Sequence, residues 1–289
     1  MKNMPYIRTD LAAESVEVGV GVSVREYERE GFKIHEAVSA EDSDAVRKGR
    51  YITVTVGSPW LYEKEAVLRA EKVISDVISE LVGAFVGDKK ASALTVCLGN
   101  RSITSDAIGP LSADRIIATR HLKSEKKELF NSLGGREISV ITPGVTGETG
   151  IETFEAIYSA VKVVKPDIVI CIDALAARSP ERLMTTVQLT NVGIAPGSGV
   201  GNHRKEISFS TLGVPVVSIG VPTVVESSTL VYDALGKAGM PDGDTRLSEV
   251  LENQRSFFVT PKNADVAVAA QASLIARSIN AALLGFAEL

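Results

Sequence analysis

Two short apolar runs of strand length, 93–98 and 167–172, constrain the fold of this chain more than any other feature. Segments with apolar residues at helical spacing separate the runs. Strands that alternate with helices favour right-handed crossovers and a largely parallel sheet. We therefore expect an α/β fold with a mostly parallel central sheet flanked by helices. Further strands are expected over 51–56, 137–142 and 215–221, and helices over 63–86, 108–120, 151–164 and 263–286.

The composition is that of a globular protein with one sizeable core. Of 289 residues, 45% are hydrophobic and 23% are charged, a balance typical of soluble domains. The chain has no internal repeat or Pro-rich linker, so a single domain is expected. Residues 1–50 are charge-rich and look peripheral, with a strand-like alternation from Val16 to Val24.

Charge and hydropathy exclude several classes of function. The net charge is −5 and Lys and Arg are scattered, so direct nucleic-acid binding is not expected. No run approaches the roughly 20 apolar residues of a membrane helix, and the N-terminus lacks the apolar core of a signal peptide. We therefore expect a cytoplasmic protein with no membrane partner. Cys97 and Cys171 lie inside apolar runs, which is typical of reduced, buried thiols.

An aspartate follows each of the two apolar runs, where open α/β sheets build their sites. Asp106 lies in the segment Gly99–Pro110, just before an expected helix, so it is either a helix N-cap or a site residue. Asp173 follows Ile172 directly. Burial there would raise its pKa above about 3.9 and suit it to proton transfer, whereas a salt bridge with Arg178 would lower the pKa.

Two glycine-rich loops accompany these aspartates. The first, 142–150, holds three glycines and a proline in nine residues, more than a plain turn needs. The second, 195–204, superficially resembles a phosphate cradle, but no Lys-Ser/Thr follows it. A loop that lines a substrate groove is favoured instead, with His203 and Arg204 as polar contacts.

Two carboxyl groups at neighbouring strand ends are suited to hydrolysis, because one can hold a proton while the other activates water. The chain is 5% aromatic with Trp60 as its single tryptophan, which favours peptide over sugar substrates. Serine chemistry is disfavoured, since no Gly-x-Ser-x-Gly motif is present. A metal site made of Asp106, Asp173 and His203 stays open as an alternative.

Four segments closely resemble motifs of the germination protease (spore endopeptidase) family: 99–110, 143–152, 173–178 and 195–204. The resemblance spans nearly the whole chain. It implies an endopeptidase that degrades small acid-soluble spore proteins during germination, as a homotetramer in the cytoplasm of the spore core. No cofactor and no metal are expected, although a cation held by the aspartate pair stays open. The resemblance also implies a fold similar to the hydrogenase-maturation proteases, and Asp106 and Asp173 as the catalytic pair.

The N-terminus resembles the family's self-processing site. Residues 8–14 are similar to the Thr-Glu-Phe-Ala-Ser-Glu type of sequence that is cut in the substrate proteins. The resemblance therefore implies cleavage between Asp10 and Leu11, with residues 1–10 as a propeptide and 11–289 as a single α/β protease domain. The alternative is a disordered tail of similar composition.

An acidic residue at the cut position suggests a groove that offers positive charge, for which Arg is well suited. The substrate-binding residues expected from the matching motifs are Asn100, Arg101, Glu148, Arg178, His203 and Arg204. Two other classes stay open: a metal-linked protease of the hydrogenase-maturation type, and a non-catalytic protein that holds a small anion. Residues 236–256 form a polar stretch expected to be a surface insertion.

Overall fold

A mixed sheet organises the computed structural model, which describes residues 9–11, 22–42, 47–87, 90–197, 204–239, 250 and 257–285. In these ranges nine strands form the sheet, in the order β1-β2-β3-β7-β8-β6-β4-β5, with β9 paired to β8. The strands are β1 (Val22–Arg29), β2 (Phe32–Ser39), β3 (Gly49–Thr55), β4 (Ala93–Cys97), β5 (Ile138–Ile141), β6 (Ile168–Ala176), β7 (Thr186–Thr190), β8 (Val216–Glu226) and β9 (Phe258–Val259).

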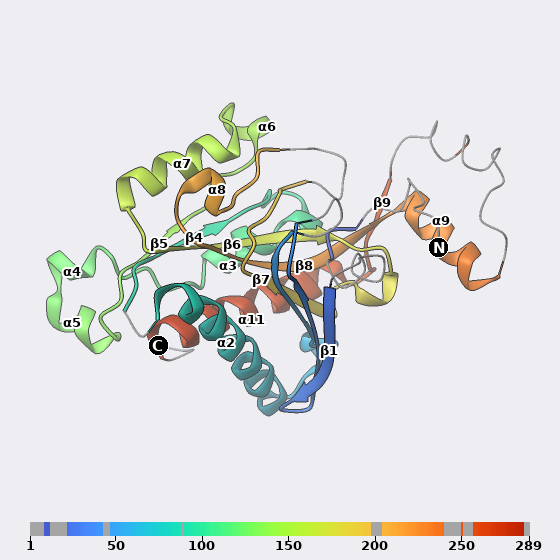
Figure 1. The fold of residues 1–289 in the computed structure, drawn as a ribbon, viewed down its shortest axis with the longest axis horizontal. Coiled ribbons are helices and arrows are strands. Elements are labelled where there is room, and N and C mark those ends of the chain that lie inside the picture. Colours follow the sequence, from blue (N-terminus) through green and yellow to red (C-terminus); the bar gives the residue numbers. More distant parts are fainter. Residues whose placement is uncertain are drawn as a thin grey trace.

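Helices cover both faces of this sheet (Figure 1). The long helices α2 and α11 pack against each other on one face, and α7 and α8 cover the other. The α-helices are α2 (Lys64–Val86), α3 (Ile108–Ala113), α4 (Leu122–Glu125), α5 (Lys127–Ser132), α6 (Thr146–Thr149), α7 (Thr153–Val164), α8 (Phe209–Leu212), α9 (Ser227–Lys237) and α11 (Ala264–Leu284), and the 3-10 helices are η2 (Pro59–Leu61), η3 (Thr104–Asp106) and η4 (Pro180–Arg182). The expected α/β class, with helices flanking a central sheet, is confirmed.

The sheet is mixed, which corrects the expectation that it would be mostly parallel. Only β5, β4, β6 and β8 pair in parallel, whereas β1, β2, β3 and β7 extend the sheet antiparallel. The first hairpin turns at Glu30 and Gly31, both with positive φ, and so short a connection joins only antiparallel strands. Its charged, half-exposed strands gave no clear apolar pattern, so β2 was not expected from the sequence.

Strand β6 is buried on both faces, which explains its apolar sequence. Val169 and Cys171 pack under α7, and Ile170 and Ile172 pack toward α2 and α11 on the opposite face. The run was expected to end at Ile172, with the aspartate at the strand exit. Instead β6 continues to Ala176 because β8 pairs with it along that length, so Asp173 lies within the strand.

Helix α11 is long and apolar enough to cross a membrane by length and composition, and 61% of its most apolar window is buried inside the protein. Residues such as Ala267, Leu274 and Ile275 belong to the main core cluster. Its hydropathy is therefore that of a core helix.

Two expectations fall mostly on residues outside the described ranges. The alternation from Val16 to Val24 overlaps the start of β1, but 12–21 lie outside. Of the expected insertion 236–256, only 236–239, where α9 ends, and residue 250 are described.

Candidate active site

Asp173 lies in β6 just beyond the point where its neighbour β4 ends. The last β4 pair joins Cys97 to Ile172, and the Leu98 N–H donates to the Ile172 carbonyl at 2.8 Å. The Asp173 side chain is 6% exposed, and its Oδ1 accepts a hydrogen bond from the Ala174 N–H at 2.9 Å. A buried carboxyl group thus sits at the edge of the parallel strands, where α/β sheets form their clefts.

The loop after β4 brings Asp106 to the same edge. Gly99 has φ +113°, and a Cβ there would lie 2.0 Å from the Asp106 carbonyl oxygen, so only glycine allows this close approach. Asp106 Oδ2 accepts a hydrogen bond from the Asn100 N–H at 2.9 Å. The N-cap of α3 is Ala107, so Asp106 is the last residue of η3 and not a helix cap.

The two carboxyl groups line one cavity of about 310 Å³. Segments that contribute to it come from the end of β4, the loop before α6, the end of β6 and the loop that ends at Arg204. Asp10, from the N-terminal segment, lines the same cavity. Folding therefore brings both predicted aspartates and the predicted cut position together.

The surroundings push the two carboxyl groups toward different protonation states. Burial raises the pKa of Asp173 well above its usual range, and the nearby carboxylates of Asp106 and Asp10 raise it further. Burial also raises the pKa of Asp106, but there the Asn100 N–H and the Arg204 guanidinium oppose the rise. Asp173 is thus suited to hold a proton, and Asp106 to supply a carboxylate. A salt bridge would instead have lowered the pKa of Asp173.

The described N-terminal residues 9–11 lie against β6 beside this pair. The Asp10 N–H donates to the Ala176 carbonyl at 2.9 Å, and the Ala176 N–H donates to Asp10 Oδ2 at 2.9 Å. Leu11 is fully buried. Its neighbours form a small apolar cluster separate from the main core: Leu175, Ala177, Leu183 and Val225. The segment is therefore held by one backbone bond and one side-chain bond of Asp10, and by apolar burial of Leu11.

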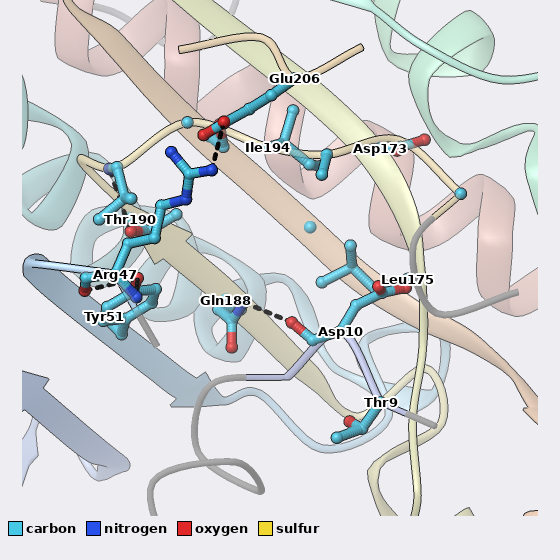
Figure 2. Close-up of a pocket in the computed structure, with 16 residues that line it drawn as sticks. Thr9, Asp10, Arg47, Tyr51, Asp173, Leu175, Gln188, Thr190, Ile194 and Glu206 are labelled. Carbon is cyan, nitrogen blue, oxygen red and sulfur yellow. Dashed lines mark hydrogen bonds and ion pairs between the residues drawn. The ribbon is translucent and has the colours of Figure 1, made fainter. Parts of the chain in front are cut away.

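A second cavity, of about 240 Å³, adjoins the first and shares Asp10 and Asp173 with it. Figure 2 shows this cavity, with Asp10 beside Leu175 and Thr9 and the Gln188 side chain directed at the Asp10 carbonyl. At the far side, Arg47 and Glu206 form an ion pair with 2.7 Å between Nη2 and Oε2. Together the two cavities form an extended groove on either side of residue 10.

The other expected binding residues are distributed unevenly. Arg204 lines the first cavity and donates to Thr153 Oγ1 at 3.5 Å. Asn100 holds Asp106 through its backbone, while its own Oδ1 accepts from the Ser102 N–H at 2.7 Å. Glu148 is exposed, and its charge raises the pKa of Asp106.

Two of the expected arginines lie outside the described lining of both cavities. Arg101 is exposed and forms an ion pair with Asp114 at 2.6 Å. Arg178 is half-buried, just past the end of β6. His203 lies outside the described residues, so the metal alternative that includes it has no described third ligand. Within the described ranges, no group of three His, Cys, Asp or Glu side chains is placed to hold a metal ion.

Sequence reasoning missed strand β7 and with it Gln188, whose Nε2 donates to the Asp10 carbonyl at 3.3 Å. The segment Thr186–Thr190 alternates polar and apolar residues, a strand signal that could have located it. No sequence pattern, however, indicates which distant segment a strand residue faces.

Comparison with known proteins decides the family. The germination protease family model matches residues 5–238, most of the chain. The chain belongs to the germination protease family. Among its relatives, the germination protease of Caldanaerobacter subterraneus subsp. tengcongensis is 39% identical, over 96% of this chain and 94% of the relative. That of Clostridium acetobutylicum is 35% identical, over 99% and 98%, and that of Priestia megaterium is 41% identical, over 79% and 66%. This germination protease is thus a peptidase, and so a hydrolase.

One solved structure that aligns with the chain is a hydrogenase-maturation protease. The [NiFe] hydrogenase maturation protease HycI from Thermococcus kodakarensis KOD1 aligns with 69% of this chain and 98% of its own, at 16% identity and a TM-score of 0.35. The likeness is remote at this score, so the fold class rests on the sheet order itself.

Proposed function

We propose that this germination protease is an endopeptidase in which Asp106 and Asp173 act as a proton-sharing pair, and that it is made as a zymogen that cuts its own Asp10–Leu11 bond. The observation that carries the proposal is the shared cavity, which both carboxyl groups line together with Asp10. An acidic segment of the same chain is thus seated beside two carboxyl groups whose pKa values are raised to different degrees.

The proposed reaction assigns one role to each carboxyl group. The Asp106 carboxylate takes a proton from a water molecule, whose oxygen bonds to the carbonyl carbon of the residue before the cut. As the carbon–nitrogen bond then breaks, the leaving nitrogen takes the proton of Asp173. The products are a new carboxyl terminus and a free amine, and one proton returns from Asp106 to Asp173 through solvent. The raised pKa of Asp106 makes it a stronger base than an exposed aspartate.

The contacts of residues 9–11 support a substrate preference of the protease for an acidic residue followed by a large apolar one. The Asp10 carboxylate accepts the Ala176 N–H, and the guanidinium of Arg204 lines the same cavity. Leu11 fills an apolar pocket. In Thr-Glu-Phe-Ala-Ser-Glu, Glu and Phe are the matching pair, so the proposed substrates are small acid-soluble spore proteins.

The same seating supports a zymogen, because a substrate cannot enter while residues 9–11 occupy the groove. Residues 1–10 are then the propeptide, and the protease domain begins at Leu11. Family resemblance supports a homotetramer in the cytoplasm of the spore core. The exposed edge strand β1 supports self-association, since its outer backbone groups are available for pairing with another strand.

Incubation of purified full-length protein tests the proposal. The wild type should lose ten residues by mass spectrometry and then turn over a Thr-Glu-Phe-Ala-Ser-Glu peptide. Asp106→Asn and Asp173→Asn should each slow both reactions by about 100-fold or more. Asp114→Asn is the matched control, because this exposed aspartate near Asp106 pairs with Arg101 outside the cavity.

Two results would overturn this assignment. Near-wild-type cleavage by either variant of the pair would leave that aspartate without a catalytic role. Loss of activity with a chelator, restored by a divalent ion, would replace the proton-sharing pair with a metal mechanism.

A further inference from the structure

Gln188 is a side chain of the groove that contacts a backbone carbonyl of residues 9–11, the seated segment. It lies in the middle of β7, paired with Thr53 of β3 on one side and Gly220 of β8 on the other. Its Nε2 lies 3.3 Å from the Asp10 carbonyl oxygen, and Figure 2 shows this bond near the centre of the cavity.

The register of β7 fixes where this amide points. Val187 and Leu189 are fully buried in the main core on the α2 and α11 face, so Gln188 faces the opposite side of the sheet, where the groove lies. Gly220, directly across on β8, is covered on this face by the Leu175 side chain, since a Cβ there would lie 2.3 Å from Leu175 Cδ1. The amide therefore reaches the groove from a rigid strand in the interior of the sheet.

The bond from Gln188 to the Asp10 carbonyl is made by a buried side chain. Gln188 is 6% exposed, and a buried amide is costly unless its polar atoms are hydrogen-bonded. Here the side-chain donor meets the carbonyl of the residue before the proposed cut. A donor held rigidly in a buried place is what stabilises an oxyanion most effectively, because it needs no reorganisation during the reaction.

We propose that Gln188 is a third catalytic residue, whose Nε2–H donates to the scissile carbonyl oxygen and stabilises the negative charge that develops there. The inference rests on the proposed function, since it takes Asp10–Leu11 as a bond that is cut. When the water oxygen bonds to the carbonyl carbon, the π electron pair moves onto the carbonyl oxygen and strengthens its bond from Gln188. The amide keeps its proton throughout, and the electron pair returns as the carbon–nitrogen bond breaks.

Self-cleavage of the full-length chain tests this role directly, because the segment is already bound and the first-order rate reports the chemical step. Gln188→Met keeps the length of the side chain and removes the donor, so cleavage should slow by about 100-fold. The loss should be the same factor at every pH, because an amide does not titrate.

Ser218→Ala is the matched control, since Ser218 also lines the second cavity and its buried Oγ has no hydrogen-bond partner in the described structure. It should cleave within about 3-fold of wild type. Thermal melts identify any variant that fails to fold. If Gln188→Met does not fold, Gln188→Leu replaces it, because its side chain also lacks a donor and does not titrate, and the same loss is expected.

The outcomes separate this inference from the function on which it rests. A folded Gln188 variant that cleaves at the wild-type rate, while Asp173→Asn is inactive, overturns the role of Gln188 alone. A loss in Gln188→Met that depends on pH also overturns it, because the substitution would then act through the titrating carboxyl groups. Equal loss in Ser218→Ala overturns it too, because the effect would then come from the shape of the groove. A wild type that leaves Asp10–Leu11 intact, or Asp173→Asn that cuts normally, overturns the proposed function itself.

Discussion

Asp10 and Ala176 are joined by two hydrogen bonds of 2.9 Å: the Asp10 N–H donates to the Ala176 carbonyl oxygen, and the Ala176 N–H donates to Oδ2 of the Asp10 carboxylate. The bonds form on the edge of β6 that β4 leaves uncovered beyond Ile172. The N-terminal segment thus lies along this free edge with one backbone–backbone bond, one bond to its own carboxylate and the Leu11 side chain in an apolar pocket. The fold therefore supplies a binding site for a peptide at the point where β4 ends.

Replacement of Gly99 by alanine should move Asp106. The added Cβ would meet the Asp106 carbonyl oxygen at 2.0 Å, and φ is +113°, so the loop must shift at a cost of about 1–3 kcal/mol. We expect Gly99→Ala to lower the melting temperature and to reduce cleavage at least tenfold. The control is Gly147→Ala in the short helix α6, where an added Cβ would meet no atom within 4 Å. It should leave the melting temperature and the cleavage rate unchanged. Normal cleavage by Gly99→Ala would show that the position of Asp106 is not critical.

Truncation of Leu11 should loosen the seated segment. A fully buried leucine contributes about 2–5 kcal/mol when replaced by alanine, and here that energy holds residues 9–11 in the groove. We expect Leu11→Ala to slow self-cleavage and to expose the segment to an added protease, as measured by mass spectrometry. Leu11→Ile conserves the volume and should behave nearly as wild type. Equal rates for all three chains would contradict a role for the apolar pocket.

Arg204, and not Arg101, should govern the binding of acidic peptides. Arg204 lines the cavity with both aspartates, whereas Arg101 is exposed and pairs with Asp114. We expect Arg204→Ala to raise KM for Thr-Glu-Phe-Ala-Ser-Glu more than for the same peptide with glutamines. Arg101→Ala should change stability by less than about 1 kcal/mol and leave KM unchanged. The reverse ranking in steady-state kinetics would exclude charge recognition by Arg204.

The cleavage rate should depend on pH as a bell-shaped curve. The acid limb follows protonation of Asp106, whose raised pKa places it above about pH 4, and the alkaline limb follows loss of the Asp173 proton. Because Arg204 lowers the pKa of both groups, Arg204→Gln should shift both limbs to higher pH. Rates measured from pH 4 to 10 check this, and limbs that stay in place would exclude the two aspartates as the titrating groups.

Stability should fall as pH rises, because of Asp173. Its pKa is raised in the folded state, so between the unfolded value of about 3.9 and the folded value the folded chain binds more protons. The stabilisation from its neutral carboxyl is full below about pH 4 and is lost as pH rises through the folded pKa.

Asp173→Asn should remove this fall and raise the melting temperature near neutral pH. Asp114→Asn gives a contrast, because the pH dependence of stability from Asp114 has the opposite sign. Arg101 lowers the pKa of this exposed carboxyl group, so the small stabilisation from the Asp114 carboxylate is lost as pH falls. Melting curves of wild type and Asp173→Asn that run parallel across pH would contradict a protonated Asp173.

Much of the fold and part of the site follow from local pattern. The runs 93–98 and 167–172 read as strands because both of their faces are buried, and α2 and α11 read as helices because apolar residues recur at helical spacing. The antiparallel strand β2 was missed because half of its side chains meet solvent or charged partners such as Arg25 and Arg50, which bond Glu36. The short β7 was missed because the mixed polar sequence around it masks its alternation.

The sequence by itself determined the α/β class, the two aspartates at the ends of apolar runs, and the acidic segment before Leu11, because each is a property of neighbouring residues. Only the tertiary structure decided that Asp10 lines one cavity with those aspartates and accepts a bond from Gln188, that Arg204 enters the cavity while Arg101 turns to Asp114, and that Asp173 is the more buried acid. These facts depend on which strands pair and where β4 stops, and strand pairing joins residues far apart in the chain through contacts that no local pattern encodes.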